Sequence, residues 1–585
     1  MLTMASTSFP ELLQAAARHF EEARPLLPMY GHLIVSALFP IYTGSYASLS
    51  RPSSAAKAAR KEKKVREDED DEDEEDEESE QKMEGLSPSD AIIFPITAAL
   101  MLAGLYFLIK RYGADAINLI LGWYFAAVGV FSVGRLINDA AGVAVTFIFP
   151  TYFGDLNGNL WKVDAEKRKA IAEQVKPKAE SNSPFPLWTP MPAFVTNRLW
   201  NLRATVKQRY ATKIFLYEVV DFTGNLTIIN FLSALLGLAS IIYANLGGKP
   251  WWLTNLQGFA VCYSALQFMS PTSFTTGSLI LMSLFCYDVW AVFFTPLMVT
   301  VAKNLDQPIK LVFPRPDEPS DIPGEPPIKS FSMLGLGDIV LPGLMIGLAL
   351  RFDLYMFYLK KQKLQKSTKK NAGEDENSIV KTPYIRATGR WGDRFWTTLV
   401  SKSNRPAHLN VSFPKPYFTA ALIGYIFGML ATLGVMSVFQ HAQPALLYLV
   451  PGVLISLWGA GLVRGEVKEM WNFSEAITGQ QFDDDDDDSQ SAEKDENKKD
   501  QGKKEGQSWI TYLWREIVGS DEHGSEDETS KKSGMAEDGD SKKDLIVAFS
   551  VARYVLSTKT ETKPHTKPRK EDDDDARSTK SNTKA

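Results

Sequence analysis

Residues 332–352 read SMLGLGDIVLPGLMIGLALRF, and this stretch decides the fold because it is long and apolar enough to cross a lipid bilayer. Its one acidic residue is Asp338, in the first half, and its one basic residue is Arg351, near the far end. An ionised aspartate near the centre of a bilayer costs at least about 2.5 kcal/mol, so a carboxyl group that is kept there indicates function. The chain is therefore predicted to hold a chemical site inside a membrane.

Apolar stretches of similar length lie on both sides of residues 332–352. They predict an all-α, multi-pass membrane protein with about nine transmembrane helices. The helices are expected at roughly 29–49, 91–109, 116–137, 226–247, 251–270, 276–300, 332–352, 416–440 and 443–463. The apolar residues 138–150 lengthen the third helix or lie at the membrane interface. The first stretch is interpreted as a retained span, because no basic segment precedes it as in a signal peptide.

Charge is concentrated in the connections between these stretches. The 585 residues include 64 Lys and Arg and 70 Asp and Glu, a net charge of −6 that does not suggest a nucleic-acid binder. The charged segments are 61–81, 151–222, 353–415 and 464–585, and we predict that they are disordered because they bury too little apolar surface. Within the last segment, residues 508–518 and 545–556 are predicted to form short amphipathic helices.

These boundaries divide the chain into seven consecutive parts. The predicted parts are 1–85 (N-terminus, first helix and acidic loop), 86–150 (helices 2–3), 151–225 (loop), 226–352 (helices 4–7), 353–415 (basic insertion), 416–463 (helices 8–9) and 464–585 (acidic tail). Lys and Arg favour the cytosolic side of membrane proteins. They are enriched after the first, third, seventh and ninth spans, which predicts a lumenal N-terminus and a cytosolic C-terminus.

Metal and cofactor sites are not expected. The two cysteines, Cys262 and Cys286, cannot form a Cys-ligated zinc site, and the run Asp483–Asp488 lacks the spacing of a calcium-binding EF-hand loop.

A second carboxylate lies in the apolar stretch 276–300, where Asp288 is close to the middle. Two carboxyl groups held close together share one proton, so that one acts as a base toward water while the other acts as an acid toward an amide oxygen. A carboxylate pair in a membrane can also serve proton-coupled transport, and the two aspartates alone do not separate these functions.

The backbone near the aspartates favours access by a peptide. Gly335 and Gly337 leave the chain bare before Asp338. Pro342 removes the helical partner of the Asp338 carbonyl, and Pro296 is expected to act in the same way on Val292.

Two further features accompany the carboxylates. Pro444 disfavours helical geometry at Gln443, so a non-helical joint is expected there. Tyr287 is adjacent to Asp288 and offers a hydroxyl that could orient a carboxyl group or a water.

Three motifs resemble those of the GxGD intramembrane aspartyl proteases, which include presenilin and the signal peptide peptidases. They are Tyr287-Asp288, the GLGD motif Gly335-Leu336-Gly337-Asp338, and the PAL motif Pro444-Ala445-Leu446. The surrounding sequence is more similar to the signal peptide peptidases, over roughly 86–150 and 225–472. The resemblance implies a presenilin-like helix arrangement, catalysis by Asp288 and Asp338 without a cofactor or metal, and active-site support from the other motif residues.

The resemblance also implies a compartment and partners. It implies residence in the endoplasmic reticulum membrane and cleavage of transmembrane peptides of type II orientation, such as remnant signal peptides, or of tail-anchored proteins. Further partners would be the lipid bilayer, a second copy of the chain as a homo-oligomer, and the endoplasmic-reticulum degradation machinery, with no nucleic acid. The alternatives are a carboxylate-based transporter and a scaffold in membrane-protein degradation.

One loop is predicted to take part in substrate capture. Residues 308–314, PIKLVFP, form a short β-prone run bounded by prolines. An extended peptide can be held by adding a strand to an exposed edge, so Ile309 to Phe313 are expected to pair with the unwound substrate.

Overall fold

A computed structural model describes most of the apolar chain and parts of its connections. The described residues are 24–56, 83–165, 167–172, 179–184, 192–216, 220–305, 309–315, 331–370, 381–410, 412–439, 443–475 and 547–553. The acidic block at 61–81, the segment 508–518 and the run Asp483–Asp488 lie outside the described residues, so their predictions stay predictions. The chain divides into two compact units, of which the larger holds the helices.

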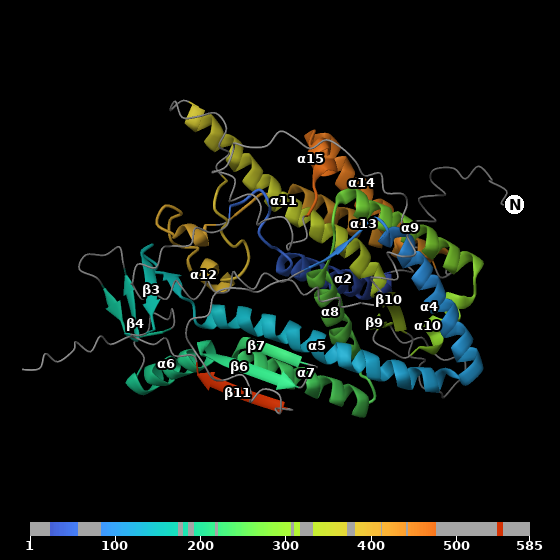
Figure 1. The fold of residues 1–585 in the computed structure, drawn as a ribbon, viewed down its shortest axis with the longest axis horizontal. Coiled ribbons are helices and arrows are strands. Elements are labelled where there is room, and N and C mark those ends of the chain that lie inside the picture. Colours follow the sequence, from blue (N-terminus) through green and yellow to red (C-terminus); the bar gives the residue numbers. More distant parts are fainter. Residues whose placement is uncertain are drawn as a thin grey trace, which may run out of the picture. The chain divides into compact units, whose positions relative to one another are not determined.

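Long apolar helices make up most of the larger unit (Figure 1). Within the described residues, eight are long and apolar enough to cross a membrane, which confirms the predicted multi-pass helical fold. They are α2 (Leu27–Ala47), α4 (Asp90–Tyr112), α5 (Ala114–Ile148), α7 (Ile228–Leu246), α9 (Phe274–Phe294), α11 (Gly337–Lys370), α13 (Pro416–Phe439) and α14 (Leu446–Arg464). The remaining predicted span is α8 (Trp251–Phe268), which is helical but buries Asn255, Gln257 and Gln267.

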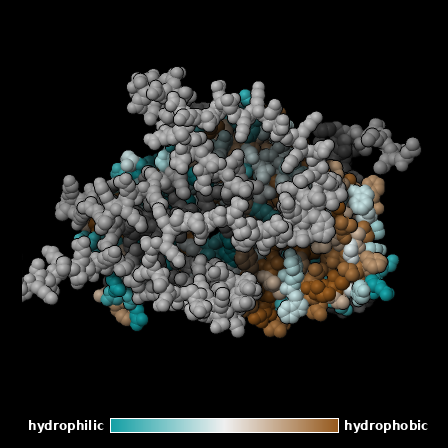
Figure 2. All heavy atoms as spheres, viewed as in Figure 1, coloured by the Kyte–Doolittle hydropathy of each residue, from teal (hydrophilic) through white to brown (hydrophobic). Residues whose placement is uncertain are grey.

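Burial separates an outer helix from a central one. In the most apolar 18-residue stretch of α4 no residue is buried, whereas in that of α11 83% of the residues are buried. Figure 2 shows apolar side chains gathered over the part of the molecule where Figure 1 places α4, α5 and α7. Large exposed apolar surfaces of this kind suit contact with lipid. Helix α11 is buried along most of its apolar length, so it lies at the centre and the other helices pack around it.

Helices α13 and α14 pack with their backbones in contact. A Cβ atom on Gly424 would lie 2.3 Å from the carbonyl oxygen of Gly452, and a Cβ atom on Gly452 would lie 2.6 Å from that of Gly424. Only glycine fits at both positions, because small residues let membrane helices approach closely. The helix that follows the PAL motif is therefore held tightly against α13.

Three helix boundaries differ from the simplest expectation. Helix α5 continues to Ile148, so the apolar residues 138–150 lengthen the third span. Helix α11 continues past the predicted end at Phe352 to Lys370, through a segment rich in good helix formers. The predicted span 276–300 is interrupted: α9 ends at Phe294, Pro296 is the N-cap residue of α10 (Leu297–Asn304), and the expected opening at Val292 becomes a complete break.

The connections that follow α5 and α11 form a folded polar lobe, which we define as the described residues of 151–207 and 381–410. Its sheet has the antiparallel order β2-β3-β4-β5. The elements are β2 (Tyr152–Gly154), β3 (Leu160–Asp164), β4 (Lys169–Ala172), β5 (Glu180–Ser181), α6 (Ala193–Lys207), α12 (Trp391–Trp396) and the 3-10 turn η3 (Ala407–Leu409). The prediction that these connections are disordered is wrong for the described residues.

Two small apolar clusters explain why the polar lobe folds. Phe153, Val163 and Trp200 are buried together, and Trp396 from the second connection packs against them. A second cluster joins Tyr152 and Leu160 to Val400 and Leu409. These clusters could not be predicted from either connection alone, because each connection is highly charged and the apolar residues that pack together come from two distant parts of the sequence.

A buried carboxylate fastens the two halves of the polar lobe. Oδ1 of Asp393 accepts hydrogen bonds from the backbone N–H groups of Thr151 at 2.6 Å and Tyr152 at 3.2 Å. Burial raises the pKa of the Asp393 carboxyl, and the two N–H groups oppose this effect. A Cβ atom on the adjacent Gly392 would lie 1.9 Å from the carbonyl oxygen of Thr146, so α12 touches the end of α5 directly.

The smaller unit contains a three-stranded antiparallel sheet of order β11-β6-β7. Its strands are β6 (Arg209–Leu216), β7 (Val220–Thr227) and β11 (Val547–Arg553). Residues 545–556 were predicted to form a helix, and the described part of this segment is a strand instead. A short apolar run cannot be assigned from periodicity alone, and here pairing with β6 decides the outcome.

Candidate active site

Asp288 lies on α9 and is largely buried. It is 8% exposed, and the backbone N–H of Leu446 lies near its carboxyl group. The second oxygen, Oδ2, is buried without a hydrogen-bond partner among the described residues. A buried carboxylate oxygen with no protein partner is costly, which marks this position as a place where chemistry is expected.

Asp338 lies in the first turn of α11. Its carboxyl group lies near the backbone N–H of Gly335 and close enough to Asp288 for the two carboxyl groups to interact electrostatically. A Cβ atom on Gly335 would lie 3.2 Å from Oδ2 of Asp338, whereas a Cβ atom on Gly337 would meet nothing within 4 Å. Gly335 thus leaves room for the carboxylate, and Gly337 leaves open space beside it.

The opening that Pro342 was expected to make in α11 is filled from a neighbouring helix. The hydroxyl of Tyr425, on α13, donates a hydrogen bond to the backbone carbonyl of Asp338 at 3.3 Å. Tyr425 is completely buried. Sequence reasoning identified the unpaired carbonyl but not its donor, although a freed carbonyl at membrane depth requires one.

The two carboxyl groups meet without a compensating cation. Within the described residues, no ion pair involves Asp288 or Asp338, and no group of three or more His, Cys, Asp or Glu side chains is placed to hold a metal ion. The arrangement is a pair of acids from two helices, which suits the sharing of one proton.

The PAL motif meets Asp288 through its backbone. Helix α14 begins at Leu446, so Pro444 and Ala445 precede the helix and the non-helical joint expected at Gln443 is present. Leu446 is buried, and its N–H lies near the carboxyl group of Asp288.

The structure brings the aspartates, the GLGD segment and the start of α14 together, but it gives Tyr287 a different surrounding from the one expected. The ring of Tyr287 lies 6.4 Å from that of Trp290, one turn along α9. Within the described residues, no hydrogen bond joins the Tyr287 hydroxyl to Asp288.

A β-hairpin leads directly into the GLGD motif. Strand β9 (Lys310–Pro314) pairs antiparallel with β10 (Phe331–Gly335), which confirms the predicted strand at 308–314. The N–H of Leu336 donates to the carbonyl of Ile309. In an antiparallel ladder every second pair of opposite residues is hydrogen-bonded, so Leu311 and Leu334 form a hydrogen-bonded pair and Val312 and Met333 do not. Val312 of β9 and Met333 of β10 therefore direct their backbone groups away from the hairpin.

The outer edge of β9 is already occupied at Val312. The N–H of Val312 donates to Oδ1 of Asn255 at 2.7 Å, and Nδ2 of Asn255 donates to the carbonyl of Val312 at 2.9 Å. The expectation that Ile309 to Phe313 pair with a substrate is therefore wrong, because α8 covers that edge. On the outer edge of β10, Phe331 and Met333 are 42% and 54% exposed.

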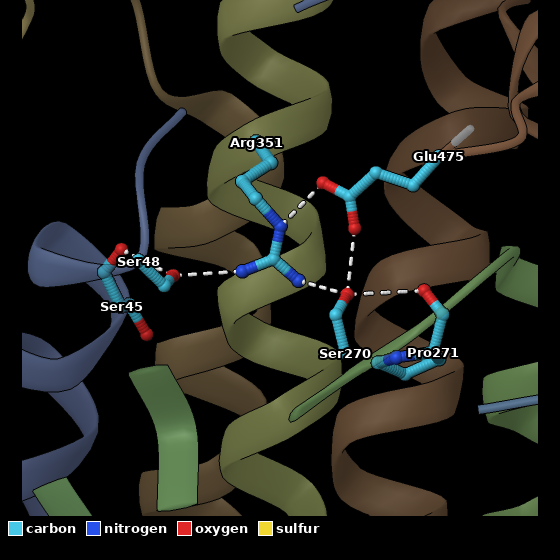
Figure 3. Close-up of polar contacts among 6 residues, drawn as sticks. All are labelled: Ser45, Ser48, Ser270, Pro271, Arg351 and Glu475. Atoms are coloured by element: carbon cyan, nitrogen blue, oxygen red, sulfur yellow. Dashed lines mark hydrogen bonds and ion pairs between the residues drawn. The ribbon is translucent and has the colours of Figure 1, made fainter. Parts of the chain in front are cut away.

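A buried cation lies near the middle of α11, about four turns after Asp338 (Figure 3). Arg351 is 5% exposed, and its Nε donates to Oε1 of Glu475 at 2.6 Å. Its remaining nitrogens donate to the hydroxyls of Ser48, at 2.7 Å, and Ser270, at 2.5 Å.

Backbone contacts complete this junction. Ser270 lies in β8 (Met269–Pro271), which pairs in parallel with β1 (Glu84–Leu86), and the N–H of Glu475 donates to the carbonyl of Thr272. Glu475 follows the short helix α15 (Val467–Asn472), so the junction ties the chain after α14 to the middle of α11.

A second carboxylate, that of Glu466 in the chain after α14, is held by two cations and a tyrosine hydroxyl. Burial would raise the pKa of the Glu466 carboxyl, but hydrogen bonds from Lys360, Tyr417 and Arg464 lower it to about 2. Glu466 thus stays ionised and connects α11, α13 and α14.

Comparison with known proteins identifies relatives over most of the chain. A family model described as signal peptide peptidase matches residues 78–477. The signal peptide peptidases of Mus musculus and Homo sapiens are each 27% identical over 450 residues, which cover 76% of this chain and 83% of each relative. Intramembrane protease 2 of Caenorhabditis elegans is 34% identical over 245 residues, 42% of both chains.

Proposed function

The chain belongs to the signal peptide peptidase family and is an intramembrane protease, and from this premise we propose that Asp288 and Asp338 form an aspartic catalytic pair. One observation carries the proposal. The carboxyl groups of α9 and α11 lie close enough to interact electrostatically, and among the described residues neither forms an ion pair with a cation. One carboxylate takes a proton from water while the other, protonated, donates to the carbonyl oxygen of the scissile peptide bond.

The neighbouring groups have supporting roles in this proposal. Leu446 orients Asp288 through its N–H, Gly335 makes room for the carboxylate of Asp338, and Tyr425 holds the turn of α11 that carries it. Pro444 and Ala445 set the start of α14. The open space at Gly337 is where the substrate backbone would approach.

The test is cleavage by the purified protein. Detergent-purified protein should cut a synthetic signal-peptide substrate, and an aspartyl-protease transition-state analogue should inhibit the reaction. Cleavage that the analogue leaves unchanged would contradict an aspartic mechanism. Ion transport in sealed vesicles without cleavage would instead favour the carboxylate-based transporter.

The substrate would be a transmembrane peptide of type II orientation, such as a remnant signal peptide, in the endoplasmic reticulum membrane. A helix hides its peptide bonds, so a stretch near the cut must unwind before water can attack. We propose that this stretch adds to the outer edge of β10, where Met333 directs its backbone groups outward and its side chain is 54% exposed.

Met333→Pro tests this edge. It removes one outward N–H while the inward hydrogen bonds of β10 remain, and proline is tolerated at strand edges. We expect kcat/KM to fall roughly tenfold, the value of one buried hydrogen bond, with little change in Tm. Met333→Ala keeps the N–H and serves as the control. Equal activity in the two variants would remove the β10 edge from substrate binding.

The orientation of the chain can be tested separately. The Lys and Arg bias places the N-terminus in the lumen and residues 51–85, 151–222, 353–415 and 464–585 in the cytosol. The packing of the connections after α5 and α11 into one polar lobe supports this assignment, because both must then lie on one side.

Protease digestion of sealed microsomes is the measurement. An epitope inserted within 401–404, an exposed turn of the polar lobe, should be removed, and an epitope at residue 10 should be spared. Protection of the first epitope together with loss of the second would reverse the orientation.

A further inference from the structure

Helix α8 contacts the hairpin that leads into the GLGD motif. A Cβ atom on Gly258 would lie 2.7 Å from Cδ2 of Leu311 and 3.2 Å from Cδ2 of Leu336. Leu311 is completely buried in this contact, and Leu336 belongs to the motif itself. The absence of a side chain at Gly258 therefore lets α8 touch both the first strand of the hairpin and the segment beside Asp338.

One turn earlier on α8, Asn255 makes the pair of hydrogen bonds that a neighbouring strand would make. Its carboxamide accepts from the N–H of Val312 and donates to the carbonyl of the same residue, at 2.7 and 2.9 Å. In an antiparallel ladder, a hydrogen-bonded residue exchanges the same two bonds with its partner. Asn255 is 3% exposed, so water cannot readily replace it.

We propose that Asn255 is a positioning residue for the catalytic pair, a role that rests on the proposed function. Its carboxamide takes the place of a third strand on β9 and holds the hairpin in register. Gly335, the last residue of β10, pairs with Lys310, and a Cβ atom built on it would lie 3.2 Å from Oδ2 of Asp338. A displacement of β9 would therefore reach Asp338 through one pair of residues.

Two substitutions separate this role from simple packing. Asn255→Leu has similar volume but leaves the N–H and C=O of Val312 without their partners, and we expect kcat/KM to fall between about tenfold and a hundredfold. Asn245→Leu is the matched control, because Asn245 is exposed on α7 and donates within its own helix to Ile241. Hydrogen exchange at the Val312 amide should accelerate in Asn255→Leu and not in the control.

Asn255→Asp gives a readout that packing alone would not move. A protonated carboxyl group can accept from the N–H of Val312 and donate to its carbonyl, whereas an ionised one can only accept. The ratio of kcat/KM in this variant to that in the wild type should therefore rise as the pH is lowered. His32, whose ring lies 5.2 Å from that of Phe313, and Lys310 are present in both proteins, so the ratio removes their effect.

The outcomes are distinct. Unchanged exchange at Val312 in Asn255→Leu, activity equal to that of Asn245→Leu, or a ratio for Asn255→Asp that does not vary with pH would each overturn the positioning role. A wild-type protein that cleaves no transmembrane peptide would overturn the proposed function itself. Loss of activity with faster exchange, together with recovery of Asn255→Asp at low pH, would support the role.

Discussion

Asp288→Asn and Asp338→Asn should each reduce cleavage by roughly three orders of magnitude or more, because asparagine keeps the shape of the side chain but cannot exchange the shared proton. The double variant should be little worse than either single variant, since the two groups act as a unit and their losses do not add. The measurement is kcat/KM for a signal-peptide substrate with each purified variant.

Folding must be followed in the same experiment. Tm should stay the same or rise in both variants, because each removes a carboxyl group that is costly at membrane depth, and that of Asp288 has a buried oxygen without a partner among the described residues. A transition-state analogue should raise Tm of the wild type and raise that of each variant much less, because only the intact pair binds it well. A well-folded single variant that cleaves near the wild-type rate would refute the catalytic pair and reopen the transporter alternative.

The second large effect is expected at Arg351. Glu475→Ala leaves a cation that is 5% exposed without its anion, and breaking a buried ion pair from one side typically costs about 3–5 kcal/mol. We expect the lower end of this range, since the Glu475 side chain is 21% exposed and water screens part of the interaction. The free energy of unfolding in detergent is the quantity to measure.

The matching control is an exposed ion pair of the polar lobe. Lys169 and Glu180 lie 2.6 Å apart but are 43% and 50% exposed, so Glu180→Ala should change the free energy of unfolding much less than Glu475→Ala does. The double variant Arg351→Met with Glu475→Ala should be more stable than Glu475→Ala alone, because no uncompensated charge remains. Equal unfolding in Glu475→Ala and Glu180→Ala would show that the buried pair contributes nothing.

Local sequence was enough to predict much of the membrane part. Apolar length predicted its helices, and the rarity of acids in such stretches singled out Asp288 and Asp338. Prolines were also informative, because the residue that each one affects can be named from the sequence. Pro342 leaves the Asp338 carbonyl without its helical donor. Pro444 disfavours helical geometry at Gln443. Pro296 ended α9 instead of opening it, because α10 restarts directly after it.

Contacts between distant segments could not be predicted in this way. The donor to the Asp338 carbonyl is Tyr425, 87 positions away, and the partner of Val312 is Asn255, 57 positions away. Residue type singles out neither, because α13 also holds Tyr417 and α8 also holds the amide side chains of Gln257 and Gln267. The polar lobe was missed for a related reason, since the cluster of Tyr152, Leu160, Val400 and Leu409 forms only when the two connections come together.

The hydrogen bond from the N–H of Thr151 to Asp393 also determines when the polar lobe can finish folding during synthesis. The two residues are 242 positions apart, so at 5–20 residues per second the ribosome needs roughly 12–50 s to deliver the carboxylate after the strand it holds. During that interval the first half of the lobe displays Tyr152 and Leu160 without Val400 and Leu409, which later pack against them. A chaperone that binds nascent aromatic segments should therefore associate with chains halted before Trp391 and release those extended past Leu409.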